Sequence, residues 1–178
     1  MVSLRSLLIL GGVRSGKSRY ALERAQSVPG RVAFVATAEA GDPEMSERIA
    51  RHREARPAGW LTVEEPVELA AALRGLHGRA DVVVVDCLNL WVSNLLCRDA
   101  SSDDPALIAR IEELCKIIET RPYHLLIASN EVGMGIHPES ALGRAFRDLL
   151  GLANQRVAAA CDEVVLMVAG LPLCLKTP

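Results

Sequence analysis

Short runs of apolar residues recur along the chain, and each is followed by a turn and a segment of helical pattern. We expect buried strands at 7–10, 32–36, 61–63, 81–86, 124–128 and 163–168, and a final edge strand at 172–176. We expect helices at 18–27, 43–55, 66–76, 88–96, 105–119 and 140–160. Continuous apolar strands that alternate with helices indicate an α/β fold, in which helices cover both faces of a mostly parallel sheet.

Composition places this pattern in one folded unit. The chain has 178 residues, of which 50% are hydrophobic and 24% are charged, so we expect a single globular domain over 1–178. The net charge is −2 and aromatic residues make up 3%. A basic surface and stacking aromatic side chains are typical of nucleic-acid binders, so we expect no nucleic-acid partner.

The cysteines and the apolar runs bear on the cellular compartment. Five cysteines stand at 87, 97, 115, 161 and 174 without any C-x-x-C pair. Scattered thiols of this kind are typical of a reducing compartment. The apolar run at 7–10 is too short for a secretory signal, and no run approaches the roughly 20 residues of a membrane span. We therefore expect a cytoplasmic protein.

A glycine-rich stretch follows the first strand and matches the pattern G-x-x-x-x-G-K-[ST]. Its residues are Gly11, Gly12, Val13, Arg14, Ser15, Gly16, Lys17 and Ser18. Glycines let backbone N–H groups curl around phosphate oxygens, and the helix that follows directs its positive end at the anion. Lys17 is then expected at the outer phosphates and Ser18 on Mg²⁺. The alternative, a glycine-rich turn with a chance Lys-Ser pair, is rare between a strand and a helix.

Asp86 ends the strand of four valines. In folds with a phosphate-binding loop, a carboxylate at such a strand end holds Mg²⁺ directly or through water. The alternative is an aspartate that caps the next helix, which is a common arrangement. Given the loop at 11–18, we expect Ser18 and Asp86 to be the metal ligands.

A basic segment at 48–56 carries one histidine. Arg48, His52 and Arg56 are spaced by four residues and share one helix face. Like charges arranged in this way disfavour the helix unless an anion lies between them. A neutral imidazole there is a nucleophile toward phosphorus. From this segment alone, a solvated basic face with an incidental histidine remains the favoured interpretation.

Several motifs together resemble the bifunctional adenosylcobinamide kinase / adenosylcobinamide-phosphate guanylyltransferase family of cobalamin biosynthesis, over nearly the whole chain. The resemblance includes the loop at 11–18, Ala-Thr-Ala at 36–38, Glu-Arg-Ile-Ala-Arg-His-Arg at 47–53, Glu-Glu-Pro at 64–66 and Asp-Cys-Leu at 86–88. The most specific piece is Ser-Asn-Glu-Val-Gly-Met-Gly-Ile at 129–136, followed by Gly143-Arg144 and Asn154-Gln155.

The resemblance implies two activities, with GTP and ATP as nucleotide substrates. One phosphorylates the hydroxyl of the aminopropanol arm of adenosylcobinamide. The other transfers GMP from GTP to that phosphate through a guanylyl group on His52, and releases pyrophosphate. The resemblance also implies a RecA-like P-loop fold and a homotrimer. Its nucleotide contacts map onto the whole loop at 11–18 and onto Ala36, Thr37, Ala38, Arg53, Glu54, Ala55, Arg56, Glu64 and Asp86.

Other functions remain as alternatives. A single-function small-molecule kinase needs Lys17, Ser18 and Asp86 but not His52. A signalling GTPase lacks support because no N-K-x-D motif occurs, and a DNA motor needs a basic face.

Glu131 either orients water or substrate, or caps a helix. Apolar residues of the 88–96 helix, Trp91 among them, exceed what one small sheet face needs, which is a second hint of an oligomer.

Overall fold

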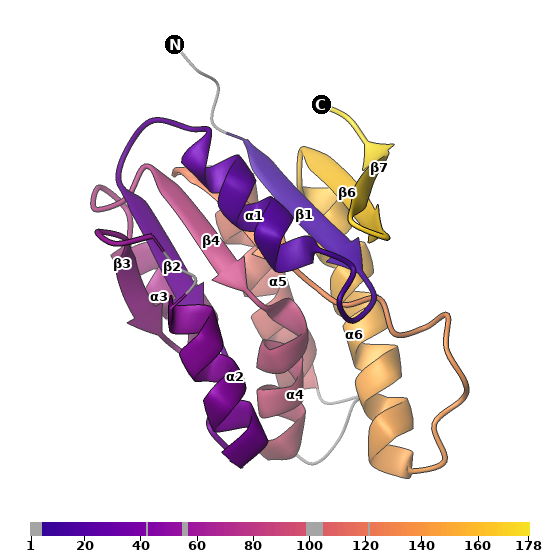
Figure 1. The fold of residues 1–178 in the computed structure, drawn as a ribbon. Coiled ribbons are helices and arrows are strands. Elements are labelled where there is room, and N and C mark those ends of the chain that lie inside the picture. The colour runs from indigo at the N-terminus through magenta and orange to yellow at the C-terminus, as the bar shows by residue number, and fades with distance from the viewer. Residues whose placement is uncertain (1–4, 42, 55–56, 99–104, 121) are drawn as a thin grey trace.

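The computed structural model describes residues 5–41, 43–54, 57–98, 105–120 and 122–178, except the side chains of residues 44, 45, 48, 51 and 52. The described chain forms a seven-stranded sheet flanked by helices (Figure 1). In chain order the elements are β1 (Ser6–Gly11), α1 (Lys17–Gln26), β2 (Val32–Ala36), α2 (Pro43–Glu54), β3 (Leu61–Glu64), α3 (Leu69–Gly75), β4 (Val82–Asp86), α4 (Leu88–Arg98), α5 (Pro105–Thr120), β5 (His124–Ala128), α6 (Ala141–Ala160), β6 (Glu163–Val168) and β7 (Leu171–Lys176).

The strand order across the sheet is β3-β2-β4-β5-β1-β6-β7. Every neighbouring pair is parallel except β6 and β7, which form an antiparallel edge pair. Parallel strands need crossover connections, and the helices between successive strands supply them. The expected mostly parallel sheet with an antiparallel edge strand is confirmed.

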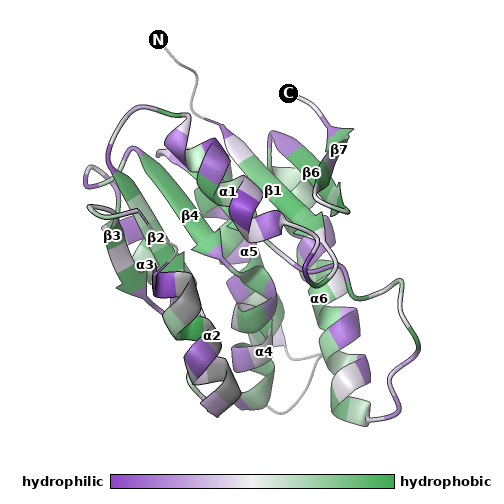
Figure 2. Cartoon of the chain, in the orientation of Figure 1, coloured by the Kyte–Doolittle hydropathy of each residue, from purple (hydrophilic) through white to green (hydrophobic). Residues whose placement is uncertain are grey.

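Side chains of each central strand divide between two cores, because successive residues point to opposite faces of a sheet. Val83 and Val85 pack on the face covered by α3, α4, α5 and α6, whereas Val82 and Val84 pack on the face that α1 covers. In Figure 2 the inner strands are coloured hydrophobic along their length, while the helices carry hydrophilic patches on part of their surface. Burial on both faces explains why these strands have continuous apolar sequences and no alternation.

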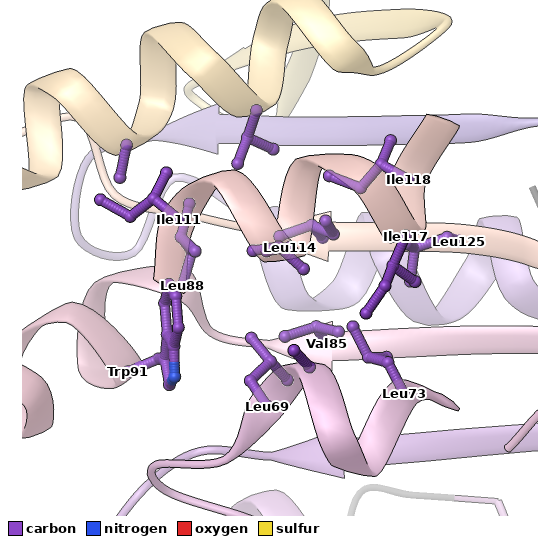
Figure 3. Close-up of a cluster of buried hydrophobic side chains, with 14 of the residues drawn as sticks. Leu69, Leu73, Val85, Leu88, Trp91, Ile111, Leu114, Ile117, Ile118 and Leu125 are labelled. Atoms are coloured by element: carbon purple, nitrogen blue, oxygen red, sulfur yellow. The ribbon is translucent and has the colours of Figure 1, made fainter. Parts of the chain in front are cut away.

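The larger core is filled by α3, α4 and α5 against β4 and β5, as the labelled side chains in Figure 3 show. Trp91 of α4 lies in this core at 1% exposure, and its indole N–H donates to the Val67 carbonyl oxygen at 2.8 Å. Trp91 shares this core with side chains of α3 and α5, so the apolar residues of this helix that exceed one sheet face are covered within the chain. The hint of an oligomer drawn from this helix therefore falls away.

Helix α3 begins later than the sequence pattern suggests. Pro66 favours a helix start, but regular helix begins at Leu69. The Glu65 carboxylate instead accepts hydrogen bonds from the N–H groups of Val67 and Glu68 and closes a turn before the helix.

In the part of the chain that the structure describes, no helix is both long enough and apolar enough to cross a membrane.

Candidate functional site

The loop between β1 and α1 closes tightly, and two of its glycines are required by geometry. Gly11 and Gly16 have φ angles of 151° and 99°, which residues with a side chain rarely adopt. A Cβ atom on Gly11 would lie 2.6 Å from the Ser15 hydroxyl oxygen and 2.7 Å from the Met167 carbonyl oxygen. The loop therefore keeps its curled shape only with glycine at its start.

Charged and hydroxyl groups of α1 meet the loop and the end of β4. Lys17 is 8% exposed, and its ammonium donates to the Gly12 carbonyl oxygen at 2.6 Å. The Ser18 hydroxyl donates to a carboxylate oxygen of Asp86 at 3.2 Å. Lys17 thus lies inside the curled loop, and the hydroxyl of the next residue, Ser18, contacts the Asp86 carboxylate.

This oxygen pair fits a magnesium ion by its chemistry. Mg²⁺ prefers hard oxygen ligands, and in nucleotide sites it takes one or two protein oxygens together with phosphates and water. Among the described residues, no group of three or more His, Cys, Asp and Glu side chains could form a dedicated metal cage. Ser18 and Asp86 match the sparse type of site that relies on the nucleotide for its other ligands.

A cavity of about 820 Å³ opens at the carboxyl ends of the strands, beside this loop. Its walls are the loop, the end of β2, the start of α4, Glu64 and one face of α2 (compare Figure 1). The α2 face consists of Ser46, Ile49, Ala50 and Arg53, whose spacing places them on one side of the helix. The Arg53 guanidinium forms an ion pair with Glu64 at this wall. Open α/β sheets bind ligands at this edge.

Two buried polar atoms in the described chain have no hydrogen-bond partner, and both belong to residues that line this cavity. They are the hydroxyl oxygen of Ser15 and the carboxamide oxygen of Asn89. Native proteins pair nearly all buried polar groups, so an unpaired one needs an explanation. Because both occur at one cavity, the explanation we favour is a polar ligand.

The structure brings most of the expected nucleotide-binding residues together at this cavity. Among the residues that line it are Val13, Arg14, Ser15, Gly16, Lys17, Ser18, Ala36, Ala38, Arg53, Glu64 and Asp86. Gly11 and Gly12 shape the loop but do not line the cavity. Glu54 is exposed on α2 and lies outside the lining. Ala55 and Arg56 fall outside the described residues. His52 has its backbone in α2, and its side chain lies outside the described part.

Thr37 is an expected contact whose polar groups are all used by the fold. Its hydroxyl donates to the Cys87 carbonyl oxygen at 2.7 Å and accepts from the Cys87 N–H at 2.9 Å. Its own N–H donates to the Asp86 carbonyl oxygen, and its carbonyl oxygen accepts from the Asn94 amide. Thr37 therefore fastens the end of β2 to the end of β4 and so positions Asp86.

Sequence reasoning missed two asparagines at the cavity. Asn89 lies one turn beyond Asp86, and Asn130 follows the end of β5. Asn154 of α6 holds the Asn130 segment, because its amide donates to the Asn130 carbonyl oxygen at 3.0 Å. Its oxygen accepts from the Ser129 hydroxyl at 2.7 Å. Their positions after the carboxyl ends of neighbouring parallel strands were the available signal.

Glu131, for which two roles were open, turns back on its own loop. Its carboxylate accepts from the Gly133 N–H at 2.6 Å, and its own N–H donates to the Gly11 carbonyl oxygen at 3.1 Å. The side chain thus caps a loop turn and no helix. The backbone bond ties the segment after β5 to the first residue of the phosphate-binding loop.

Comparison with known proteins gives a consistent family. Residues 7–175 match the family model described as cobinamide kinase / cobinamide phosphate guanyltransferase. The bifunctional adenosylcobalamin biosynthesis protein CobP of Pseudomonas aeruginosa is 45% identical over 169 residues, which cover 95% of this chain and 96% of that protein. CobU of Escherichia coli K12, which carries the same bifunctional description, is 38% identical over 96% of this chain and 99% of its own.

Solved structures with little sequence similarity share the fold. The RadB recombinase aligns with a TM-score of 0.54 at 15% identity, over 91% of this chain and 73% of its own. An ATPase of a type III secretion system aligns with a TM-score of 0.55 at 8% identity, over 91% of this chain and 50% of its own. These similarities confirm the expected P-loop, RecA-like fold class.

Proposed function

The chain belongs to the cobinamide kinase / cobinamide phosphate guanyltransferase family, and from that premise we propose that the cavity beside residues 11–18 binds the nucleotide in both reactions. The family is bifunctional, which sets aside the alternative of a single-function kinase. The observation that carries the placement is the unpartnered buried hydroxyl of Ser15, which lies at this cavity in the curled loop that holds Lys17. The Ser15 hydroxyl can donate a hydrogen bond to a phosphate oxygen of the nucleotide.

In the kinase reaction, the loop and its cation hold the triphosphate in line with the acceptor. The hydroxyl oxygen of adenosylcobinamide forms a bond to the γ-phosphorus, and the bond from that phosphorus to the bridging oxygen breaks as the nucleoside diphosphate leaves. The hydroxyl proton passes to water. Lys17 neutralises charge on the outer phosphates, and backbone N–H groups of the loop donate to them. Ser18 and Asp86 would hold Mg²⁺, which neutralises phosphate charge when bound.

In the guanylyl reaction, we assign the covalent carrier to His52. An imidazole nitrogen forms a bond to the α-phosphorus of GTP, and pyrophosphate leaves. A phosphate oxygen of adenosylcobinamide phosphate then attacks the same phosphorus, the P–N bond breaks, and adenosylcobinamide-GDP is released. The support is the resemblance of residues 47–53 and the position of α2, whose Ile49 and Arg53 line the cavity. Arg53 stabilises charge on the phosphates as the bonds change.

Labelled GTP tests this assignment. With α-labelled GTP and Mg²⁺ but no corrinoid, we expect label to remain on the denatured protein and to leave it when adenosylcobinamide phosphate is added. With γ-labelled GTP we expect no label on the protein. Label on the protein from the γ-position, or none from the α-position, contradicts the guanylyl-histidine pathway.

We further propose a homotrimer, on the family resemblance, and a cytoplasmic location, on the scattered cysteines. The described surface offers an apolar edge that suits an assembly, because Leu171, Leu173 and Leu175 of the edge strand β7 are each more than half exposed. Light scattering at micromolar concentration tests the assembly, and a monomer contradicts it.

A further inference from the structure

Asn89 is one of two described residues whose buried polar atom finds no hydrogen-bond partner in the fold. It is the second residue of α4, and its carboxamide oxygen is buried without a hydrogen-bond partner among the described residues. Asn94, on the same helix, offers the contrast. Its amide donates to the carbonyl oxygens of Thr37 at 2.8 Å and Pro66 at 3.1 Å. Asn94 therefore holds the fold together, whereas the carboxamide oxygen of Asn89 bonds to none of the described residues.

The chemistry of the unpartnered atom limits what can satisfy it. A carboxamide oxygen only accepts hydrogen bonds, so phosphate oxygens, which are also acceptors, cannot pair with it. It needs an O–H or N–H donor that enters the cavity with a substrate. A donor placed there removes the penalty of a buried unpaired acceptor, whereas the protein without that substrate keeps it.

The position of Asn89 in the cavity indicates which substrate group donates to its carboxamide oxygen. Asp86, which ends β4, comes three residues before Asn89, and both line the cavity beside Lys17 and Ser18. With the triphosphate in the loop, this is the end where the terminal phosphate meets its acceptor. The acceptor of the kinase reaction is a hydroxyl, which carries the required O–H.

We propose that Asn89 is a catalytic residue of the kinase reaction, whose carboxamide oxygen accepts the hydrogen bond of the hydroxyl that is phosphorylated. This inference rests on the proposed placement of the triphosphate in the loop. The amide is too weak a base to remove the proton. It orients the hydroxyl so that an oxygen lone pair faces the γ-phosphorus, and the proton leaves to water as the new O–P bond forms and the β–γ bridge breaks.

The proposal makes opposite predictions for stability and for activity. Asn89→Ala removes an unpaired buried acceptor, so we expect the melting temperature of the nucleotide-free protein to stay the same or to rise. Kinase kcat/KM for adenosylcobinamide should fall about 10- to 100-fold, the effect of losing one substrate hydrogen bond in a site built for it. The dissociation constant for ATP should change less than about two-fold. Asn89→Ser, which keeps an acceptor oxygen, should recover part of the kinase rate.

The guanylyl reaction supplies the internal reference, because its acceptor is a phosphate without the reacting hydroxyl. Started from adenosylcobinamide phosphate and GTP, Asn89→Ala should transfer GMP at the normal rate. The matched control is Asn94→Ala, which leaves two carbonyl groups unpaired. It should lower the melting temperature and affect both reactions by the same factor.

The outcomes separate this inference from the proposed function. A normal kinase rate in Asn89→Ala overturns the role, as does a fall in melting temperature equal to that of Asn94→Ala. An equal loss of ATP binding and of both activities overturns it too, because the donor would then belong to the nucleotide. Lys17→Ala is measured in parallel. If it is normal in both reactions, the placement of the triphosphate is wrong, whatever Asn89 does.

Discussion

The Ser18 hydroxyl and the Asp86 carboxylate meet at 3.2 Å although they are 68 positions apart in the chain. Ser18 follows the loop after β1, and Asp86 ends β4, with β5 between these two strands in the sheet. Their meeting therefore depends on the order of the strands and on the fastening of β2 to β4 through Thr37.

Replacing the Asp86 carboxylate by an amide tests the metal assignment. Asp86→Asn keeps the shape of the side chain and an oxygen that can accept from Ser18, but it removes the negative charge. We expect the apparent affinity for Mg²⁺ to fall about 10- to 100-fold in both reactions. Initial rates at increasing Mg²⁺ concentration measure this. Asp148→Asn, at an exposed residue, is the control, and an unchanged Mg²⁺ dependence in Asp86→Asn refutes the assignment.

Lys17→Ala should slow both reactions, because we propose one nucleotide site for both and Lys17 is held inside the loop. Loss of such a charge-assisted contact costs roughly 2–4 kcal/mol in the transition state. The ratio of wild-type to variant kcat/KM, measured for the kinase and for the guanylyl reaction, gives this loss of transition-state stabilisation. Lys116→Ala, on the exposed side of α5, should keep wild-type rates. Equal loss in the control would point to a general effect of charge.

Variants of His52 should separate the two activities. His52→Ala and His52→Asn should lose labelling from α-labelled GTP and guanylyl transfer. Phosphorylation of adenosylcobinamide, which we assign to Lys17, Ser18 and Asp86, should continue. The bound label on the wild type should be labile in acid and stable in alkali, as a P–N bond is. His77→Ala, at an exposed turn, should label normally. Labelled His52→Ala would place the nucleophile elsewhere.

Asn154→Leu should destabilise the protein. The change leaves the buried Ser129 hydroxyl and the Asn130 carbonyl oxygen without partners, and an unpaired buried group costs about 1–3 kcal/mol. The free energy of unfolding in urea is the measurement. Gln155→Ala, at the exposed neighbour, should change it by less than about 0.5 kcal/mol. Equal stability of the two variants would mean that Asn154 does not hold the β5 segment.

His124 should make the protein less stable in mild acid. Partial burial, with a further contribution from the Arg5 charge, lowers the pKa of His124, and its Nδ1 accepts from the Arg5 backbone N–H at 3.3 Å. The unfolded chain therefore binds a proton more readily. This contribution to stability is complete above the unfolded pKa of about 6.5 and is lost as the pH falls through the lower folded value.

Urea unfolding at about pH 7.5 and about pH 5.5, on either side of that unfolded pKa, measures the effect. His124→Asn keeps an acceptor for the Arg5 N–H but does not titrate, so its loss of stability between the two pH values should be smaller than that of the wild type. His77→Gln should behave as the wild type does. The same fall in all three proteins would exclude His124 as the source.

The sequence predicts the elements of this fold well where local patterns decide them. The four valines before Asp86 predicted β4, and the helix expected from Ser18, after the G-x-x-x-x-G-K-S pattern, begins one residue earlier, at Lys17. The start of α3 was missed because the Glu65 side chain satisfies two N–H groups outside the helix. Pro66 favours a helix start in the sequence, but the geometry of the Glu65 side chain decides where the helix begins, and the sequence does not show that geometry.

The site was predictable where a motif names a residue and not where the fold assembles it. Lys17, Ser18 and Asp86 come from patterns with a known chemical purpose. Asn89 and Asn130 each follow a predicted strand, which the sequence shows. They reach the same cavity because β4 and β5 end side by side, and only the strand order of the fold shows that. Thr37 lies in a family motif, yet three of its four hydrogen bonds join it to Asp86 and Cys87 at the end of β4, and the fourth comes from Asn94 of α4.

The strand order also determines when this protein can become functional during its own synthesis. Among the described strands, β1, which leads into the phosphate-binding loop, pairs only with β5 and β6. Ser6 lies opposite Leu125, and Leu7 lies opposite Leu126 and Glu163. A ribosome has therefore made most of the polypeptide before the loop has a neighbour to hold it. Pairing across such separations is slow, because the intervening chain must first be ordered. Nascent chains that stop before β5 should not bind nucleotide, even though every residue of the motif has already emerged.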